Sequence, residues 1–137
     1  MKRADDGLPL FGQRSRELGV RVPPDPNADI DVDSNGEIVM NGKGMSVADH
    51  WQSLPPHLIP KRLRDRARGA IGSNATSCYR LGEGPFSASP INDRLILAVD
   101  SDRHGLICPS EAMTMESFQS ALAGTRLQWE VDEQDRQ

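Results

Sequence analysis

The sequence predicts an α+β fold made of antiparallel β-hairpins and one amphipathic helix near the C-terminal end. Two apolar runs, at residues 95–99 and 104–108, flank a polar turn, which is the pattern of a hairpin. A second hairpin is predicted where Asn35-Gly36 separates two short segments, the first of which alternates. An apolar stripe that follows Thr114 supplies the helix.

The composition fits one globular domain with many turns. A chain of 137 residues is long enough for one hydrophobic core. Its 12 glycines and 10 prolines, with only 4% aromatic residues, favour short elements and loops. We expect residues 1–28 to form a partly extended N-terminal segment, residues 28–132 a single compact domain, and residues 133–137 a tail.

Charge and hydropathy argue against two classes of partner. Non-specific nucleic-acid binding needs a basic protein face, whereas this chain has a net charge of −4, so nucleic acid is not expected as a principal partner. No apolar run approaches the length of a membrane helix, and the first residues lack the apolar stretch of a secretory signal. These patterns predict a soluble protein that is made in the cytoplasm.

The first hairpin is expected just after a proline-rich stretch. Asn-Gly suits the two positive φ angles of a type I′ turn, so strands are predicted at about residues 29–34 and 37–41, around Asn35-Gly36.

The same segment also fits the first part of a calcium-binding loop. Asp31, Asp33 and Asn35 would supply oxygen ligands at the usual spacing. The fit fails at the twelfth position, because Gly42 stands where a bidentate glutamate is needed. We therefore prefer the plain hairpin.

A helical stretch is predicted after Pro60. Leu63, Ala67 and Ala70 recur on one side of it. Most of the other positions are basic, namely Lys61, Arg62, Arg64, Arg66 and Arg68. This basic face has two interpretations: a solvated surface, or an electrostatic patch for a phosphate-bearing ligand or an acidic partner.

Histidine and cysteine spacing predicts no metal site. His50 and His57 lack a Cys, Asp or Glu partner at a metal-ligand spacing, which favours turn packing or surface placement. Cys78 and Cys108 are too few for a disulfide framework and are predicted to be reduced core or strand residues.

The C-terminal third leaves one alternative open. Residues 78–81 predict another short strand. Thr114 is expected to cap the final helix, whose apolar face can be followed to Trp129. We prefer a continuous helix, but it could also stop at Gly124 and be followed by a strand over residues 127–131.

Ser46 and His104 form the strongest candidate for a small-molecule site. Glycines at positions 42 and 44 let the backbone approach a ligand closely, and the Ser46 hydroxyl can then hydrogen-bond a ribose or a phosphate. His104 begins a strand-like run and could supply a complementary donor or acid–base group near neutral pH.

The order of the motifs also carries a resemblance. The motifs are Asp29-Ile30, Asn35-Gly36, Gly44-Met45-Ser46-Val47, Tyr79-x-Leu81 with Gly82-Glu83-Gly84, Leu95 to Val99, and His104-x-x-Ile107-x-Pro109 with Met113. Over about residues 28–129 the chain is similar to the small cytotoxic effectors of bacterial type VI secretion that have an ADP-ribosyltransferase-like toxin fold. This resemblance implies split antiparallel sheets with NAD in the cleft between them.

The resemblance also implies roles for particular residues. It implies catalytic roles for Ser46 and His104. It implies NAD contacts from a wider set: Gly44, Met45, Ser46, Tyr79 and Arg14. The chain departs from the family pattern where Met45 replaces a threonine and Lys43 a glycine, so one hydroxyl is lost. Glu83 is the glutamate best placed by motif, although the pattern assigns no catalytic acid.

The function implied by the resemblance is loss of nicotinamide from NAD and transfer of the ADP-ribosyl group. The protein would be a bacterial toxin that acts in the cytoplasm of a target cell, is delivered by a contact-dependent secretion system, and is neutralised by an immunity protein. A catalytically silent interaction domain of the same fold is the alternative, favoured by Met45 and by the unassigned glutamate. In the enzyme we expect Ser46 and His104 to line one cleft, whereas in the silent domain they can lie far apart.

Overall fold

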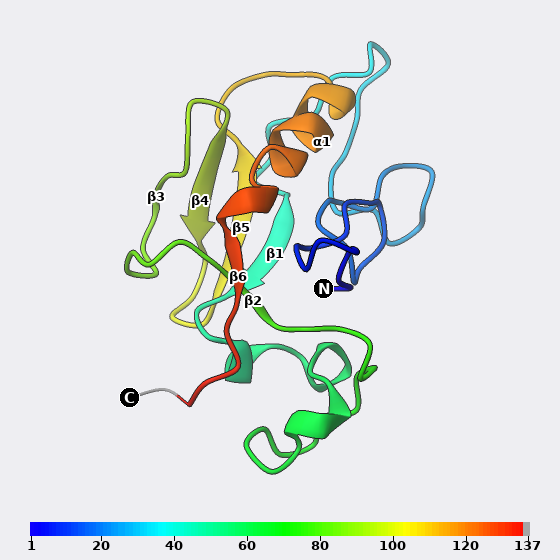
Figure 1. Cartoon of the computed structure of the whole chain (residues 1–137). Helices are drawn as coiled ribbons and strands as arrows, with labels where there is room; N and C mark the ends of the chain where they lie inside the picture. Colours follow the sequence, from blue (N-terminus) through cyan, green and yellow to red (C-terminus); the bar gives the residue numbers. More distant parts are fainter. Residues whose placement is uncertain (136–137) are drawn as a thin grey trace.

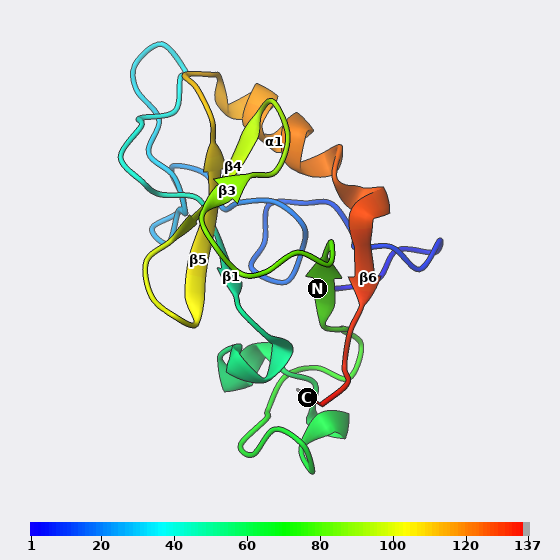
Figure 2. The same cartoon turned by 90° about the vertical axis from the view of Figure 1, so that its left-hand side faces the viewer.

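The computed structural model describes residues 1–135 and has an α+β fold with two antiparallel sheets (Figures 1 and 2). The larger sheet has the strand order β1-β5-β4-β3. Its strands are β1 (Met45–Ala48), β3 (Ser89–Pro90), β4 (Leu95–Val99) and β5 (His104–Pro109). The smaller sheet pairs β2 (Tyr79–Leu81) with β6 (Trp129–Val131).

The helices are short. The helix α1 spans Met115–Ala123. Single turns of 3-10 helix lie at η1 (Trp51–Ser53), η2 (Pro56–Leu58), η3 (Lys61–Leu63) and η4 (Arg126–Gln128). Among the described residues, no helix has the length and apolar character needed to cross a membrane.

The central hairpin of β4 and β5 confirms the prediction from the two apolar runs. Leu95 lies opposite Pro109 and Val99 opposite Gly105, so β5 extends one residue beyond the predicted run. The N–H groups of Asp100 and Ser101 both donate to the carbonyl of His104 at 3.2 Å and close the turn.

The hairpin around Asn35-Gly36 forms, but the predicted strands and turn type are wrong. It contains only an isolated antiparallel bridge between Val32 and Ile38. Gly36 has a φ of +79°, whereas Asn35 has a negative φ, which rules out a type I′ turn. The reason is Asp33: its carbonyl accepts the Gly36 N–H, and its Oδ1 accepts the N–H groups of Asn35 and Glu37 at 2.8 and 3.0 Å.

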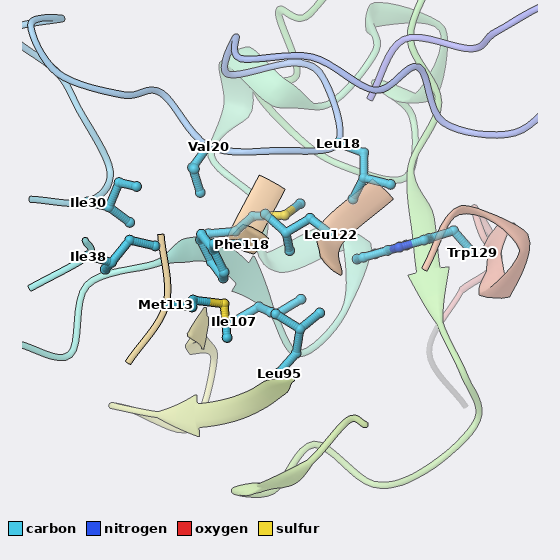
Figure 3. Close-up of a cluster of buried hydrophobic side chains, with 11 residues drawn as sticks. Leu18, Val20, Ile30, Ile38, Leu95, Ile107, Met113, Phe118, Leu122 and Trp129 are labelled. Carbon is cyan, nitrogen blue, oxygen red and sulfur yellow. The ribbon is translucent and has the colours of Figure 1, made fainter. Parts of the chain in front are cut away.

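The hydrophobic core lies between α1, the larger sheet and the N-terminal segment (Figure 3). Phe118 and Leu122 of α1 are fully buried, as are Leu95 of β4 and Leu18 and Val20 of the N-terminal segment. Thr114 caps α1 as predicted, because its Oγ1 accepts the Ser117 N–H at 3.1 Å.

Gln119 of α1 holds the N-terminal segment against the core. Its Oε1 accepts the Val20 N–H at 3.3 Å and its Nε2 donates to the Val20 carbonyl at 2.9 Å. The side-chain amide therefore satisfies both backbone groups of a fully buried residue, as a neighbouring strand would.

The chain after α1 forms a strand, as in the alternative prediction. The preferred prediction of a continuous helix to Trp129 is wrong. After α1 and η4, β6 pairs with β2, so Trp129 lies opposite Leu81. The buried Trp129 Nε1 donates to Thr125 Oγ1 at 2.9 Å, and that hydroxyl donates to the Leu122 carbonyl at 2.7 Å. These two bonds fix the turn between helix and strand.

The helical stretch predicted after Pro60 is only partly formed. It begins as η3 and continues as irregular turns to residue 69. The predicted apolar side is buried all the same: Leu63, Ala67 and Ala70 pack with Trp51, Ile59 and Cys78 in a second, smaller cluster.

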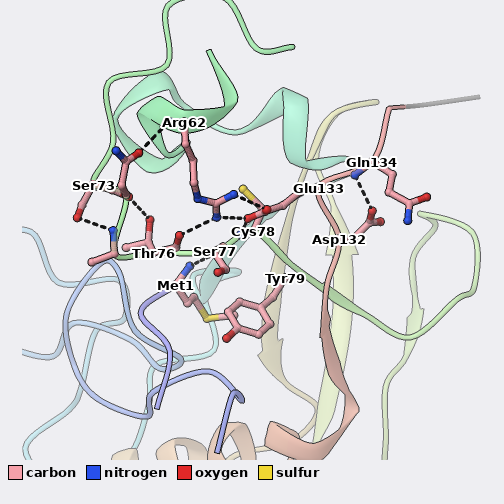
Figure 4. A network of polar contacts seen from close by, with 12 residues as sticks. Met1, Arg62, Ser73, Thr76, Ser77, Cys78, Tyr79, Asp132, Glu133 and Gln134 are labelled. Atoms are coloured by element: carbon pink, nitrogen blue, oxygen red, sulfur yellow. Dashed lines mark hydrogen bonds and ion pairs between the residues drawn. The ribbon is translucent and has the colours of Figure 1, made fainter. Parts of the chain in front are cut away.

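Arg62 and Glu133 tie this second cluster to the segment that follows β6 (Figure 4). The Arg62 guanidinium donates to both carboxylate oxygens of Glu133 at 2.6 Å and to the Thr76 carbonyl at 3.1 Å. The Cys78 N–H donates to Glu133 Oε1 at 3.2 Å. Burial would raise the pKa of Glu133, but the hydrogen bonds from Arg62 and Cys78 outweigh it and lower that pKa. Of the predicted tail, residues 136–137 lie outside the described residues.

Glu133→Gln should destabilise the fold by about 1–2 kcal/mol at neutral pH, because it removes a charge-assisted bidentate pair. A carboxylate whose pKa is lowered on folding contributes stability above its unfolded value of 4.5, and that stability is lost as the pH falls through the folded value. Urea unfolding of the variant should therefore show a flatter fall in stability below about pH 5.

Glu130→Gln is the matched control, because Glu130 lies three residues earlier, on β6, but its side chain is 74% exposed and 4.0 Å from Arg80. It should change stability by less than about 0.5 kcal/mol. Equal effects of the two substitutions would contradict the assignment.

Candidate functional site

A cleft of about 930 Å³ lies between the two sheets. Met45, Leu97 and Ile107 of the larger sheet line one side, and Tyr79 and Trp129 of the smaller sheet line the other. Sites for small organic ligands typically have volumes of roughly 300–1,000 Å³ and a mostly apolar lining. The cleft is thus large enough for a ligand of nucleotide size.

The hydrogen bonds of β1 can be assigned from its register with β5. Bonds in an antiparallel pair join every second pair of opposite residues. The Asp49 N–H donates to the Arg103 carbonyl at 3.2 Å, in the same register that sets Val47 opposite Gly105 and Met45 opposite Ile107. The backbone groups of Met45 and Val47 therefore point toward β5.

Ser46 and Ala48 consequently direct their N–H and C=O groups away from β5. Because β1 is the edge strand of its sheet, no neighbouring strand takes these groups. Within residues 1–135 they also form no other hydrogen bond. Both residues line the cleft, so this edge offers a ligand two donors and two acceptors in a fixed row.

Three arginines line the cleft, and they differ in how far their charge is neutralised. The Arg21 guanidinium donates two hydrogen bonds to the Asp29 carboxylate, at 2.8 and 3.2 Å. The Arg16 guanidinium donates only to the His57 carbonyl, at 3.4 Å, and has no carboxylate within 4 Å among residues 1–135. Arg16 is therefore the cation most available to an anionic ligand.

Arg80, the third arginine, lies among carboxylates. Its guanidinium is 3.7 Å from Asp132, 3.8 Å from Glu83 and 4.0 Å from Glu130. The Glu83 side chain is 85% exposed, whereas that of Asp132 is 24% exposed. Asp132 is consequently the more enclosed carboxylate beside Arg80, and both it and Glu83 line the cleft.

The structure gathers only some of the predicted site residues in the cleft. Met45, Ser46 and Tyr79 line it, but Gly44, Arg14 and His104 do not. The Tyr79 hydroxyl donates to the Gly7 carbonyl at 2.9 Å, and burial raises the pKa of this phenol. Tyr79 therefore presents its ring to the cleft as a neutral aromatic group.

His104 lies on the sheet face opposite to the core. Residues that are directly opposite in an antiparallel pair share a face, so His104 shares a face with Ala48 and, two residues along, with the Ser46 side chain. Met45 and Ile107 occupy the other face. The His104 ring is half-exposed, and its Nδ1 lies 2.7 Å from Asp100 Oδ1.

The two cysteines do not supply a nucleophile. Both are buried and free. Burial, reinforced by the Glu133 carboxylate, raises the pKa of Cys78 to about 11, and burial also raises the pKa of Cys108. Both thiols are therefore protonated at neutral pH, when only a thiolate would be reactive.

No sequence motif points to the β1 edge, Arg16 or Asp132 as parts of the site. Edge position depends on strand order, which no local motif encodes. Arg16 stands in a run of polar residues, and its place beside the cleft depends on long-range contacts such as the bond to the His57 carbonyl, 41 positions away.

Gly44 is required by packing inside the protein. A Cβ at this position would lie 2.2 Å from the Ile107 carbonyl oxygen and 3.1 Å from Cys108 Sγ. Gly44→Ala should therefore destabilise the fold by roughly 1–3 kcal/mol, measured by urea unfolding. Gly84→Ala is the control, because a Cβ there meets nothing within 4 Å. A Gly44→Ala protein with unchanged stability would contradict this role.

No family model, no curated protein sequence and no solved structure matches this chain.

Proposed function

We propose that the cleft binds NAD and that the protein is an NAD-consuming enzyme of the ADP-ribosyltransferase type. The observation that carries this proposal is the free edge of β1, where the N–H and C=O groups of Ser46 and Ala48 border a cleft of nucleotide size. The resemblance of the sequence motifs to ADP-ribosyltransferase-like toxins points to the same ligand.

The β1 edge suits the nicotinamide group in particular. A carboxamide carries one acceptor and two donors on adjacent atoms, so it can bond to the N–H and the C=O of a single residue at once. Ser46 offers such a pair next to the half-buried side chain of Val47, which lines the cleft and against which an aromatic ring can pack.

The remainder of the dinucleotide has complementary groups in the cleft. The pyrophosphate needs a cation whose charge is not already neutralised, and Arg16 meets that condition. Tyr79 offers an aromatic face, and Asp132 is a carboxylate that can accept hydrogen bonds from ribose hydroxyls.

The proposed reaction breaks the bond between the ribose and the nicotinamide nitrogen. Both electrons of that bond leave with nicotinamide, and an oxocarbenium-like ribosyl centre develops. An acceptor nucleophile, or water, then forms the new bond to the ribose and loses its proton. The cleft would contribute by fixing both ends of NAD, so that the bond to be broken is held in place.

The biological role proposed with this chemistry is that of an effector toxin. It would act in the cytoplasm of a bacterial target cell after contact-dependent delivery, and a cognate immunity protein would neutralise it. The family resemblance supports this role.

A catalytically silent binding domain is the second candidate. Two observations favour it: Glu83 is largely exposed, and His104 does not line the cleft with Ser46. Such a domain would bind NAD or another nucleotide without releasing nicotinamide.

The purified protein should bind NAD and release nicotinamide, which is followed by chromatography. Arg16→Gln should weaken NAD binding about tenfold, because it removes a charge-assisted bond to phosphate. Arg14→Gln makes the same charge change two residues away, outside the cleft. A larger loss in Arg14→Gln would contradict the assignment of Arg16, and binding without release would favour the silent domain. Folded protein that neither binds NAD nor releases nicotinamide would sink the proposal.

Ser46→Pro should abolish NAD binding while leaving the sheet intact. Proline removes the N–H that points into the cleft, and this N–H is not part of the β1–β5 ladder. Ser46→Ala keeps the backbone donor. It should weaken binding less than about threefold, because the Ser46 hydroxyl lies on the sheet face opposite to the core, whereas the backbone N–H points from the strand edge into the cleft. Calorimetric titration with NAD measures both affinities. The opposite order, with alanine more damaging than proline, would show that the hydroxyl is the recognition group.

A further inference from the structure

The 3-10 turn and the irregular turns at residues 61–70 present three distinct stripes of side chains. Positions three or four residues apart fall on one side of a helical turn. One stripe is apolar and buried: Leu63, Ala67 and Ala70. The second, Arg62 and Arg66, faces the segment after β6. The third consists of Lys61, Arg64 and Arg68, which we call the basic stripe.

Internal contacts account for the first two stripes. Arg62 is bonded to Glu133, and the Arg66 guanidinium donates to the Glu133 carbonyl at 2.7 Å. Arg66 also lies over the Trp51 ring, 5.7 Å from its centroid. Both arginines thus serve the fold and are not available to a partner.

The basic stripe has no such role. Its three residues, Lys61, Arg64 and Arg68, are exposed, and within residues 1–135 none has a carboxylate within 4 Å. The one side-chain bond is a weak one at 3.4 Å from Arg64 Nε to the Ala70 carbonyl. Like charges at this spacing repel one another, so the stripe does not stabilise the turns that carry it.

An exposed apolar residue lies beside the basic stripe. Ile71 is 60% exposed, and its N–H is fixed by a 3.0 Å bond to the Pro56 carbonyl. Its two chain neighbours contact the stripe, because Ala70 accepts from Arg64, and the Gly72 carbonyl accepts the Lys61 N–H. An apolar residue beside arginines is the composition of a protein interface.

We propose that the basic stripe and Ile71 together form a docking surface for an acidic protein partner. Carboxylates on the partner would pair with Arg64 and Arg68, and an apolar side chain would cover Ile71. A protein partner fits better than nucleic acid, because a phosphate backbone has no apolar group with which to cover the exposed Ile71.

The proposed docking surface lies next to one wall of the cleft. The segment that joins β1 to the basic stripe includes Leu54, Pro55, His57 and Leu58, all of which line the cleft. A partner seated on the stripe therefore lies beside the cleft wall, although the docking proposal does not depend on what the cleft binds.

The test uses a fluorescein-labelled peptide with four glutamates on each side of one phenylalanine, and fluorescence anisotropy at low salt. The native protein should bind it, Arg64→Gln with Arg68→Gln should weaken binding about tenfold, and Ile71→Ser should weaken it severalfold. The matched control is Arg94→Gln with Arg103→Gln, an equal charge change at two exposed arginines that immediately precede β4 and β5. This control should bind like the native protein.

Three results would overturn the proposal: no binding by the native protein, equal weakening in the control pair, or tighter binding of a 12-base-pair DNA duplex than of the peptide. If the glutamine pair fails to fold, Arg64→Lys with Arg68→Lys keeps the charge and should still bind the peptide, although severalfold more weakly because lysine lacks the two-pronged guanidinium. Loss of binding in that folded lysine pair would equally count against a charge-based surface.

Discussion

The fold depends on the burial of one face of α1. Phe118 and Leu122 are fully buried where the larger sheet, the N-terminal segment and the turn before β6 meet. The helix has nine residues, too few to be stable alone in water, so its formation and the burial of this face must occur together. The two sheets do not exchange strands, and it is packing around α1 that sets them on the two sides of the cleft.

Side chains replace missing regular structure at several places. Gln119 substitutes for a strand beside Val20, the Asp33 carboxylate organises a turn, and Glu133 joins the second apolar cluster to the chain that follows β6. In each case a polar side chain satisfies backbone groups that a longer helix or sheet would have satisfied, and Glu133 also pairs with Arg62.

Local sequence patterns predicted most of the strands and the helix. Turn geometry, strand order and the position of the site residues depend on other contacts, many of them long-range. The β4–β5 hairpin and the Thr114 cap were predictable, because each depends on residues close in sequence. The turn at Gly36 was predicted with the wrong geometry, since the side chain of Asp33 competes with the Asn-Gly preference. Of the site, Met45, Ser46 and Tyr79 could be identified from motifs. The contribution of Ser46 through its backbone depends on β1 being an edge strand, which follows from the order of strands alone.

The free edge of β1 also bears on self-association. An exposed edge strand is a template on which a second chain can add a strand, and proteins usually protect such edges with charge, proline or extra length of loop. Here β1 has four residues, and the backbone groups that would pair are turned into a cleft. A strand of another molecule would have to enter that recess to pair with them, so the geometry that leaves these groups open to a small ligand also protects the chain from aggregation through this edge.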